Sequence, residues 1–311
     1  MTGAGCPLAA MKHADMPTIH ALNSAFALPG HLYFEAGPAG LPHAVFHGSL
    51  AQARLSLQGA QLMTWQPSGQ RPVIWLSERG QFAQGQALRG GVPLCWPWFG
   101  ANPASSTHGF VRTAMWQITA SKLHADGRVQ LQLGLRDSPQ TRKLWDHGFE
   151  LFLNCTIGAD LRLELCTRNT GETALNITQA LHSYFCIGDI RRTRVLGLEG
   201  CTYLDKVQNF APKQQLGAIT FTAETDRVYV DTTVDCIIDD EAWGRRIRVA
   251  KQGSLSTVVW NPWLERASAL SDMAPQSYHN MVCVETCNAG PDHITVEPGE
   301  QHSLSAHISV T

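Results

Sequence analysis

Residues 161–169 read LRLELCTRN, and this stretch decides the class of the fold. Leucine occupies every second position from Leu161 to Leu165, and polar or small residues fill the positions between. Successive side chains of a β-strand point to opposite faces of a sheet. The pattern therefore predicts a strand with one face in a core and the other face polar.

Segments of the same kind recur along the chain. They are short, alternating or β-branched, and bounded by Gly, Pro, Asn or Asp; they cover 53–59, 61–65, 128–135, 151–158, 174–185, 202–207, 226–231, 245–250, 256–263 and 302–310. No helical segment of a dozen residues separates them, which argues against βαβ units. The sequence therefore predicts an all-β fold, a large antiparallel β-sandwich.

The chain length suits one large domain of this kind. With 311 residues it can bury a large core without disulfides. It contains no internal repeat, low-complexity tract or obvious linker. We expect residues 1–25 to form a loosely ordered leader and residues 26–311 to form a single β-sandwich domain.

Charge and cysteine content exclude several classes of protein. The formal net charge of −2 argues against a nucleic-acid partner, which normally requires a strongly basic surface. The nine cysteines are odd in number and form no CxxC pair, so neither a disulfide framework nor a zinc ribbon is indicated. No secretory signal is found, and no apolar run approaches the roughly 20 residues of a membrane span. We expect a cytoplasmic protein with no membrane partner.

The segment RGGVPLCWPWFG, residues 89–100, combines an arginine with glycines, prolines and aromatics. Gly90 and Gly91 permit a tight backbone path with positive φ, and the prolines restrict the segment further. One interpretation is a core-lining loop plugged by aromatics. The other is a rigid wall that presents Arg89 to an anionic or hydroxylated ligand.

A second arginine follows in HGFVR, residues 108–112. An isolated histidine is more often structural than catalytic, but His108 and Arg112 lie close in sequence to the aromatic-rich segment. A guanidinium group is a planar fork that suits carboxylate or phosphate. These residues therefore indicate a site for an anionic ligand.

The segment ALHSYF, residues 180–185, contains the best candidate for a proton donor near neutral pH, His182. Strand alternation places Leu181 and Phe185 on one face and His182 and Tyr184 on the other. The alternative is a buried histidine that hydrogen-bonds to the backbone.

The segment VCVETCNAG, residues 282–290, carries a single acid in an otherwise apolar strand. A carboxylate is rarely placed in such a run unless it is paired or used, so Glu285 is a candidate general base. Alternation places Cys283, Glu285 and Cys287 on one face, but the spacing and the histidines of a zinc site are absent. We expect no metal here.

In their order, these blocks resemble the hexose-6-phosphate mutarotases, a branch of the aldose 1-epimerase (galactose mutarotase-like) family. The blocks are RGGVP with WPWFG, HGFVR, HSYF, ETDRVY (224–229), WNPW (260–263) and VCVETCNA. The resemblance extends from about residue 40 to the C-terminus. Each block is modestly specific, and six in the right order are strongly so.

The resemblance implies a β-sandwich of supersandwich topology and an acid–base pair without metal or other cofactor. It implies a histidine acid at His182 and a glutamate base at Glu285. It places substrate contacts at Arg89, His108, Arg112 and Asp226. The position before His108, a glutamine that contacts substrate in some members, is Thr107 here, and that role is not carried over.

The implied reaction is the interconversion of the α and β anomers of a hexose 6-phosphate, with D-glucose 6-phosphate the expected substrate. A carboxylate and an imidazole suit it, because ring opening removes one proton from the C1 hydroxyl and gives one to the ring oxygen. Three alternatives stay open: a mutarotase for free aldoses, a non-catalytic module that binds sugar phosphates, and an inactive structural sandwich. We expect a small-molecule partner only, and a monomer.

Overall fold

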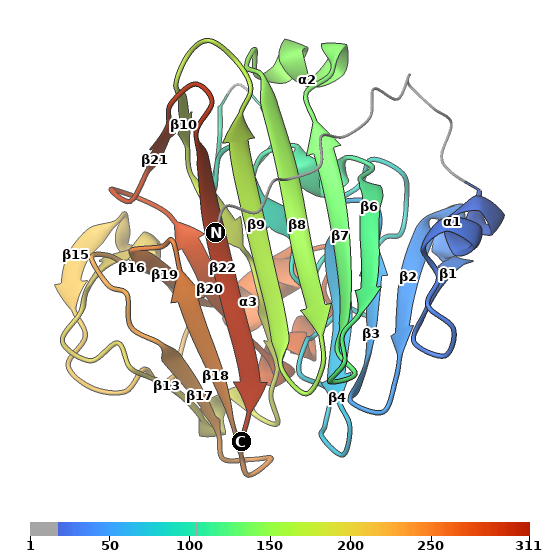
Figure 1. Ribbon diagram of the computed structural model, residues 1–311. Coiled ribbons are helices and arrows are strands. Elements are labelled where there is room, and N and C mark those ends of the chain that lie inside the picture. The colour runs from blue at the N-terminus through green and yellow to red at the C-terminus, as the bar shows by residue number, and fades with distance from the viewer. Residues whose placement is uncertain (1–17, 104) are drawn as a thin grey trace.

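The computed structural model describes residues 18–103 and 105–311, and strands dominate it (Figure 1). Two eight-stranded sheets carry the fold, beside a four-stranded and a two-stranded sheet. All their strand pairs are antiparallel. The predicted all-β antiparallel architecture is confirmed.

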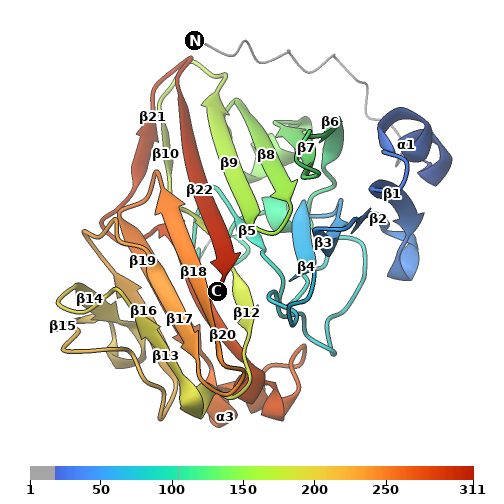
Figure 2. The same cartoon turned by 60° about the horizontal axis from the view of Figure 1, so that its bottom comes forward.

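The first large sheet, here the β9 sheet, contains the strand from which the fold was predicted. Its order is β13 (Thr193–Leu196), β17 (Cys236–Asp240), β18 (Arg245–Gln252), β22 (Gln301–Val310), β9 (Leu161–Asn169), β8 (Phe149–Ile157), β7 (Val129–Arg136) and β6 (Gln117–Leu123). Figure 2 shows β22, β9 and β8 side by side. Leu161, Leu163 and Leu165 are buried, as the alternation predicted.

The second large sheet, here the β20 sheet, carries the candidate site. Its order is β15 (Ala211–Gln214), β14 (Thr202–Asp205), β16 (Thr225–Tyr229), β19 (Ser256–Asn261), β20 (Met281–Asn288), β11 (Gln179–Leu181) and β5 (Leu94–Cys95), and β12 (Tyr184–Cys186) also pairs with β20. The two-stranded sheet joins β10 (Leu175–Ile177) to β21 (Ile294–Val296).

Both faces of the β20 sheet are covered. All eight residues of β20 are buried. Val282 and Val284 join the main apolar core, which also includes the inward leucines of β9. Cys287 belongs to a second, smaller apolar cluster with Val228 and Val258. A strand buried on both faces can hold polar side chains away from water, which is how Glu285 comes to lie inside the molecule.

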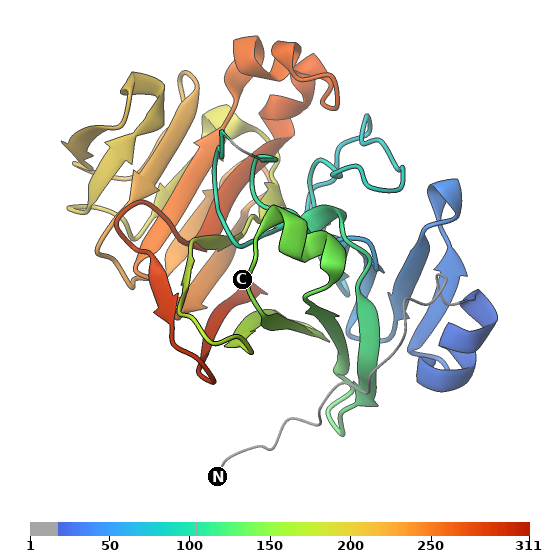
Figure 3. The ribbon, with the colours of Figure 1, turned by 90° about the horizontal axis from the view of Figure 1, so that it is seen from above.

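The four-stranded sheet and a helix lie to one side, opposite β14–β16 (yellow) in Figure 3. The sheet contains β1 (Leu32–Ala36), β2 (Pro42–His47), β3 (Ala51–Ser56) and β4 (Gln61–Pro67). Helix α1 (Ile19–Phe26) starts at Thr18, whose hydroxyl accepts a hydrogen bond from the backbone N–H of Ala21. Asn23 exchanges two hydrogen bonds with the backbone of Phe34, which holds α1 against β1.

Helix α1 corrects part of the expected leader. Residues 1–17 lie outside the described residues, but residues 19–25 are helical and Leu22 is buried. An eight-residue helix has too few turns to show a clear apolar period, which is why the sequence did not reveal it.

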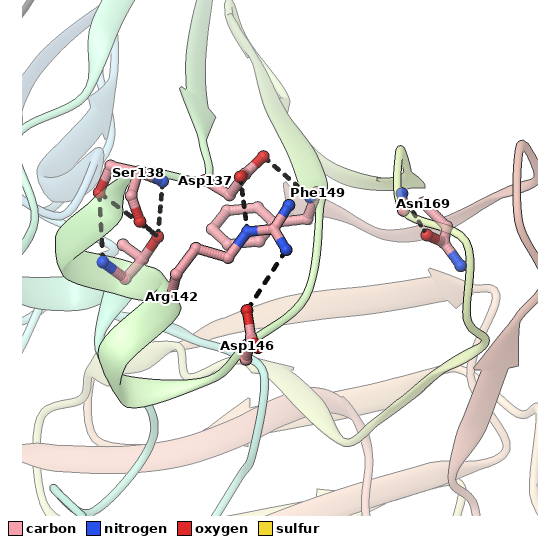
Figure 4. Close-up of polar contacts among 8 residues, drawn as sticks. Asp137, Ser138, Arg142, Asp146, Phe149 and Asn169 are labelled. Atoms are coloured by element: carbon pink, nitrogen blue, oxygen red, sulfur yellow. Dashed lines mark hydrogen bonds and ion pairs between the residues drawn. The ribbon is translucent and has the colours of Figure 1, made fainter.

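A short helix, α2 (Pro139–Leu144), is fixed by polar contacts between β7 and β8 (Figure 4). Ser138 and Thr141 form a capping box at its start. Arg142 lies 2.8 Å from Asp137, whose other carboxylate oxygen accepts a hydrogen bond from the backbone N–H of Phe149. The following Trp145 packs edge-on against Trp96 at 5.1 Å, so this connection supports the start of the WPWFG segment.

The third helix, α3 (Trp263–Ala269), ends the predicted strand 256–263 early. Buried Asn261 closes β19 by donating to the carbonyl oxygens of Tyr278 and Met281 and by accepting from the N–H of Trp263.

Short 3-10 turns occur at Pro38–Gly40, Val111–Thr113, Ile190–Arg192, Lys206–Gln208 and Pro275–Asn280. Within 18–103 and 105–311, no helix has the length and apolar character needed to cross a membrane.

Candidate active site

His182 lies where two strands meet the same neighbour. β11 ends at Leu181 and β12 begins at Tyr184, and both strands pair with β20. The ring of His182 stacks on that of Tyr184, with centroids 4.8 Å apart and planes 9° from parallel. Leu181 and Phe185 belong to the main core, and the strand predicted over 174–185 is interrupted at His182 and Ser183.

His182 faces Glu285 of β20. Its Nδ1 lies 3.4 Å from Glu285 Oε1, and the two side chains are 12% and 1% exposed. Nδ1 of His182 and Oε2 of Glu285 have no hydrogen-bond partner among the described residues. Buried polar atoms are normally paired, so this pair has unused capacity to bind a ligand.

Burial favours the uncharged form of both groups. It raises the pKa of Glu285 well above the usual range of a carboxyl group. It lowers the pKa of His182 well below 6.5, and the positive charge of Arg89 acts in the same direction. The neutral pair holds its proton on Glu285, and the ion pair holds the same proton on His182. In either form the pair offers one proton donor and one acceptor.

His108 is fixed as a neutral hydrogen-bond donor beside this pair. Its Nδ1 accepts a hydrogen bond from the backbone N–H of Gly100 at 3.1 Å, so its proton lies on Nε2. Burial, followed by the charges of Arg112 and Lys206, lowers its pKa to about 3. The ring meets that of His182 edge-on, with centroids 5.6 Å apart.

The two motifs that carry these residues fit against each other through their backbones. The N–H of Phe110 donates to the carbonyl of Trp96, and the N–H of His108 donates to that of Gly100. A Cβ atom at Gly109 would lie 1.8 Å from the carbonyl oxygen of Trp96. Only glycine fits so close a contact at its φ of +73°.

Arg89 is held from several directions. Its Nε lies 3.2 Å from both carboxylate oxygens of Asp272, and its NH1 donates to the hydroxyl of Tyr184 at 3.2 Å. The buried side chain of Gln61 donates to the carbonyls of Leu88 and Gly90, on either side of Arg89. These contacts fix the position of the Arg89 guanidinium beside Tyr184.

Arg112 forms fewer hydrogen bonds with the described residues than Arg89 does. Its NH2 donates to the carbonyl of Thr107 at 2.6 Å. The ion pairs found in the described part of the chain include none with Arg112. Its charge lowers the pKa of both His108 and His182, so it acts on the same site.

Asp226 lies on β16 in the β20 sheet, within the predicted strand 226–231. Its Oδ2 lies 2.7 Å from Nζ of Lys206, and its buried Oδ1 has no hydrogen-bond partner among residues 18–103 and 105–311. Burial raises its pKa. The structure thus brings together all six residues to which the sequence assigned a role.

Two neighbours of the site, Lys206 and Asp272, carried no recognisable signal in the sequence. Lys206 lies in a segment predicted only as a strand, and Asp272 lies outside every motif. Phe99 and Trp260 surround His182, with ring centroids 6.1 and 6.4 Å away. Trp96, in contrast, is buried in the main core and donates to Thr167, so it seals the core.

The fold and this site define a class of protein. The sequence profile of the family described as Aldose 1-epimerase matches residues 45–309, and the chain belongs to this family. It is 41% identical over 242 residues to the Escherichia coli (strain K12) protein named "Putative glucose-6-phosphate 1-epimerase", covering 76% of this chain and 80% of that one. A Salmonella typhimurium protein of the same name is 41% identical over 251 residues, covering 79% of this chain and 83% of that one.

Solved structures agree on the fold. A crystal structure described as "a putative mutarotase (YeaD)" from Salmonella typhimurium has a TM-score of 0.86 and 35% identity, covering 92% of this chain and 95% of that one. A galactose mutarotase-like protein from Clostridium acetobutylicum has a TM-score of 0.67 at 12% identity, covering 90% of this chain and 98% of that one. This second likeness concerns the fold alone.

Proposed function

We propose that this chain is a glucose-6-phosphate 1-epimerase, an isomerase that interconverts the α and β anomers of a hexose 6-phosphate. The observation that carries the proposal is the buried His182–Glu285 pair, 3.4 Å apart, in which each partner keeps an unpaired polar atom. The relatives at 41% identity carry the same activity in their name.

The reaction requires one proton donor and one proton acceptor of the protein to act on the same sugar. Glu285 takes the proton of the C1 hydroxyl while His182 gives a proton to the ring oxygen, the C1–O5 bond breaks, and the aldehyde forms. Rotation about C1–C2 presents the other face of the carbonyl, and the same two residues then close the ring with their roles exchanged. Each acid or base group contributes roughly 10²–10⁴-fold to such a step.

In this scheme the empty site stores the proton on Glu285, since burial favours the neutral pair. Transfer of that proton across the 3.4 Å contact produces the carboxylate and imidazolium that begin ring opening. No proton need enter from solvent, because the pair holds one proton before and after the transfer.

The positively charged side chains of the site favour a phosphorylated substrate. Arg89 and Lys206 are each paired with an aspartate, whereas Arg112 binds only a backbone carbonyl among its described hydrogen-bond partners. We assign Arg112 to the phosphate, Arg89 and His108 to sugar oxygens, and Asp226 to a sugar hydroxyl through its unpaired Oδ1. The apolar side of the sugar lies against Phe99 and Trp260 in this proposal.

The deciding experiment is anomer exchange measured by NMR magnetisation transfer on glucose 6-phosphate, free glucose and free galactose. We expect fast exchange of the phosphorylated sugar, lost in Glu285→Gln and in His182→Asn. Exchange of the free sugars alone would support the acid–base mechanism but contradict the assignment of Arg112 to a phosphate. No acceleration of any sugar would leave a non-catalytic binding module.

All residues of the proposed site come from one chain, so the mechanism needs no second copy. A monomer and a cytoplasmic location stay predictions from the sequence. Sedimentation of the purified chain tests the first of them.

A further inference from the structure

Three different donor atoms meet beside the proposed reaction centre. His182, Cys283 and Glu285 each offer one donor atom, and these atoms all lie within 4.8 Å of one another. All three residues are classed as buried or nearly so, and Glu285 is only 1% exposed. Two polar atoms of the cluster, on His182 and Glu285, have no partner among the residues described.

Strand register produces this cluster. Cys283 and Glu285 are two residues apart on β20 and so face the same side of the sheet. Cys283 lies directly opposite Tyr184 in the β12–β20 ladder. Because His182 stacks on Tyr184, its ring comes to lie over both β20 side chains. Strand alternation alone groups Cys283, Glu285 and Cys287, and the histidine that completes a donor set comes from outside β20.

The donor set suits zinc. A neutral imidazole, a thiolate and a carboxylate are its usual ligands, at about 2.0–2.3 Å. Together they carry two negative charges, which balance a divalent cation. Ligands at such bond lengths lie roughly 3.3–3.8 Å apart around a tetrahedral ion, so the cluster must contract by about 1.5 Å at most. Three protein ligands leave the fourth position of a tetrahedral ion open.

The surrounding charges leave room for a cation. Of the positive side chains that act on these three residues, Arg89 and Lys206 are already paired, with Asp272 and Asp226 respectively, and Arg112 acts on His182 alone. Binding displaces the thiol proton of Cys283 to solvent, together with the proton that the acid–base pair holds. The ion then occupies both groups that the sugar requires.

We propose that His182, Cys283 and Glu285 form an inhibitory site for zinc or another thiophilic divalent cation. Occupancy and sugar turnover exclude each other, because two of the three ligands are the proposed acid and base. The inhibitory part rests on the proposed function, whereas the binding part does not.

The binding test uses the full chain, zinc chloride and equilibrium dialysis. We expect one zinc ion per chain, and at least about 10-fold weaker binding in Cys283→Ser, since even an outer partner of a metal ligand contributes that much. Cys287→Ser is the matched control: Cys287 is equally buried on the same face of β20 but outside the donor set, and its variant should bind as the parent does. Equal binding in the parent and Cys283→Ser would place the ion elsewhere and overturn the proposal.

Absorption spectroscopy of the parent protein tests the site even if the Cys283→Ser variant does not fold. Cobalt(II) added to the parent protein should give the thiolate-to-metal charge-transfer absorption of a cysteine ligand, and zinc should displace it. Cobalt bound without that absorption would overturn the site as surely as equal binding in the variant.

The activity arm compares anomer exchange with and without zinc. We expect micromolar zinc to stop exchange of glucose 6-phosphate in the parent, EDTA to restore it, and Cys283→Ser to resist the inhibition. Full exchange with zinc bound would remove the inhibitory role. Absence of exchange in the metal-free parent would instead contradict the proposed function, while the dialysis and cobalt results would stand independently.

Discussion

At the scale of single residues, the environment of a side chain decides what it can do. Motifs pointed to His182 and Glu285, but no spacing in the sequence conveys that burial moves their pKa values in opposite directions. That burial comes from strands about a hundred residues apart, brought together by the β11–β20 and β12–β20 ladders. The identity of the pair was predictable from sequence, and its protonation state was not.

The protonation state of His182 is directly measurable. Because burial and the positive charge of Arg89 lower its pKa, its ring should stay neutral in the ligand-free protein as the pH falls through 6.5, and gain a proton only well below that value. Nitrogen-15 NMR of the imidazole reports this. A ring that becomes charged at or above pH 6.5 would mean that Glu285 is ionised in the empty site.

In the proposed mechanism Arg112 binds the phosphate and takes no part in the proton transfers. Since a hydrogen bond to a charged group contributes about 1.5–3 kcal/mol, Arg112→Ala should raise KM for glucose 6-phosphate roughly 10- to 100-fold with little change in kcat. The exchange rate of any free hexose that the enzyme accepts should not change. Arg128→Ala, at an exposed pair with Asp126 outside the site, is the control. An unchanged KM would remove Arg112 from the phosphate site.

At the scale of elements, long alternating strands were predictable and short or capped elements were not. β9 has the bounds that its leucine alternation gave, 161–169. Helices α1 and α3 have eight and seven residues, too few for a helical period, and β5 has only two. Such elements form because the tertiary structure holds them, as Asn23 holds α1 and Asn261 starts α3.

The contact between the WPWFG and HGFVR segments gives a prediction at this scale. In Gly109→Ala the new Cβ would meet the carbonyl oxygen of Trp96 at 1.8 Å, so the segment must move and carry His108 with it. We expect a loss of about 1–3 kcal/mol in the free energy of unfolding, together with a marked fall in activity.

Denaturant unfolding and the exchange assay together measure both effects. Gly217→Ala is the matched control, since its Cβ would meet nothing within 4 Å and its φ is not in the positive range. A Gly109→Ala protein as stable and active as the Gly217→Ala protein would show that the two segments are not rigidly joined.

At the scale of the whole molecule, the sequence predicted which residues are buried but not which strands are neighbours. Apolar alternation marks the inward face of each strand, and it says nothing of the order β13-β17-β18-β22-β9-β8-β7-β6. In that order β22, from the end of the chain, lies between β18 and β9. Lys206 and Asp272 were not predicted for the same reason. Only the tertiary arrangement of the strands brings them to the site, and no local sequence pattern marks it.

The buried acid has a cost for the stability of the whole protein. Its folded-state pKa is raised, so above about pH 4.5 the unfolded chain releases the Glu285 proton while the folded chain keeps it. Stability therefore falls as the pH rises toward the folded-state pKa. Glu285→Gln removes this titration, so the variant should be inactive yet lose less stability than the parent as the pH rises from 5 to 8.

Thermal or denaturant unfolding of the parent and Glu285→Gln across that pH range measures the difference. A difference that stays constant with pH would mean that Glu285 ionises in the folded protein much as it does in the unfolded one.

The double burial of β20 bears on how such proteins diversify. One set of its alternate residues, including Val282 and Val284, packs the interior, and the other set includes Glu285 of the proposed site. Selection on substrate preference can therefore act on one set while selection on folding acts on the other. A lineage built this way can change what it recognises without redesigning its scaffold, in keeping with a fold shared at 12% identity.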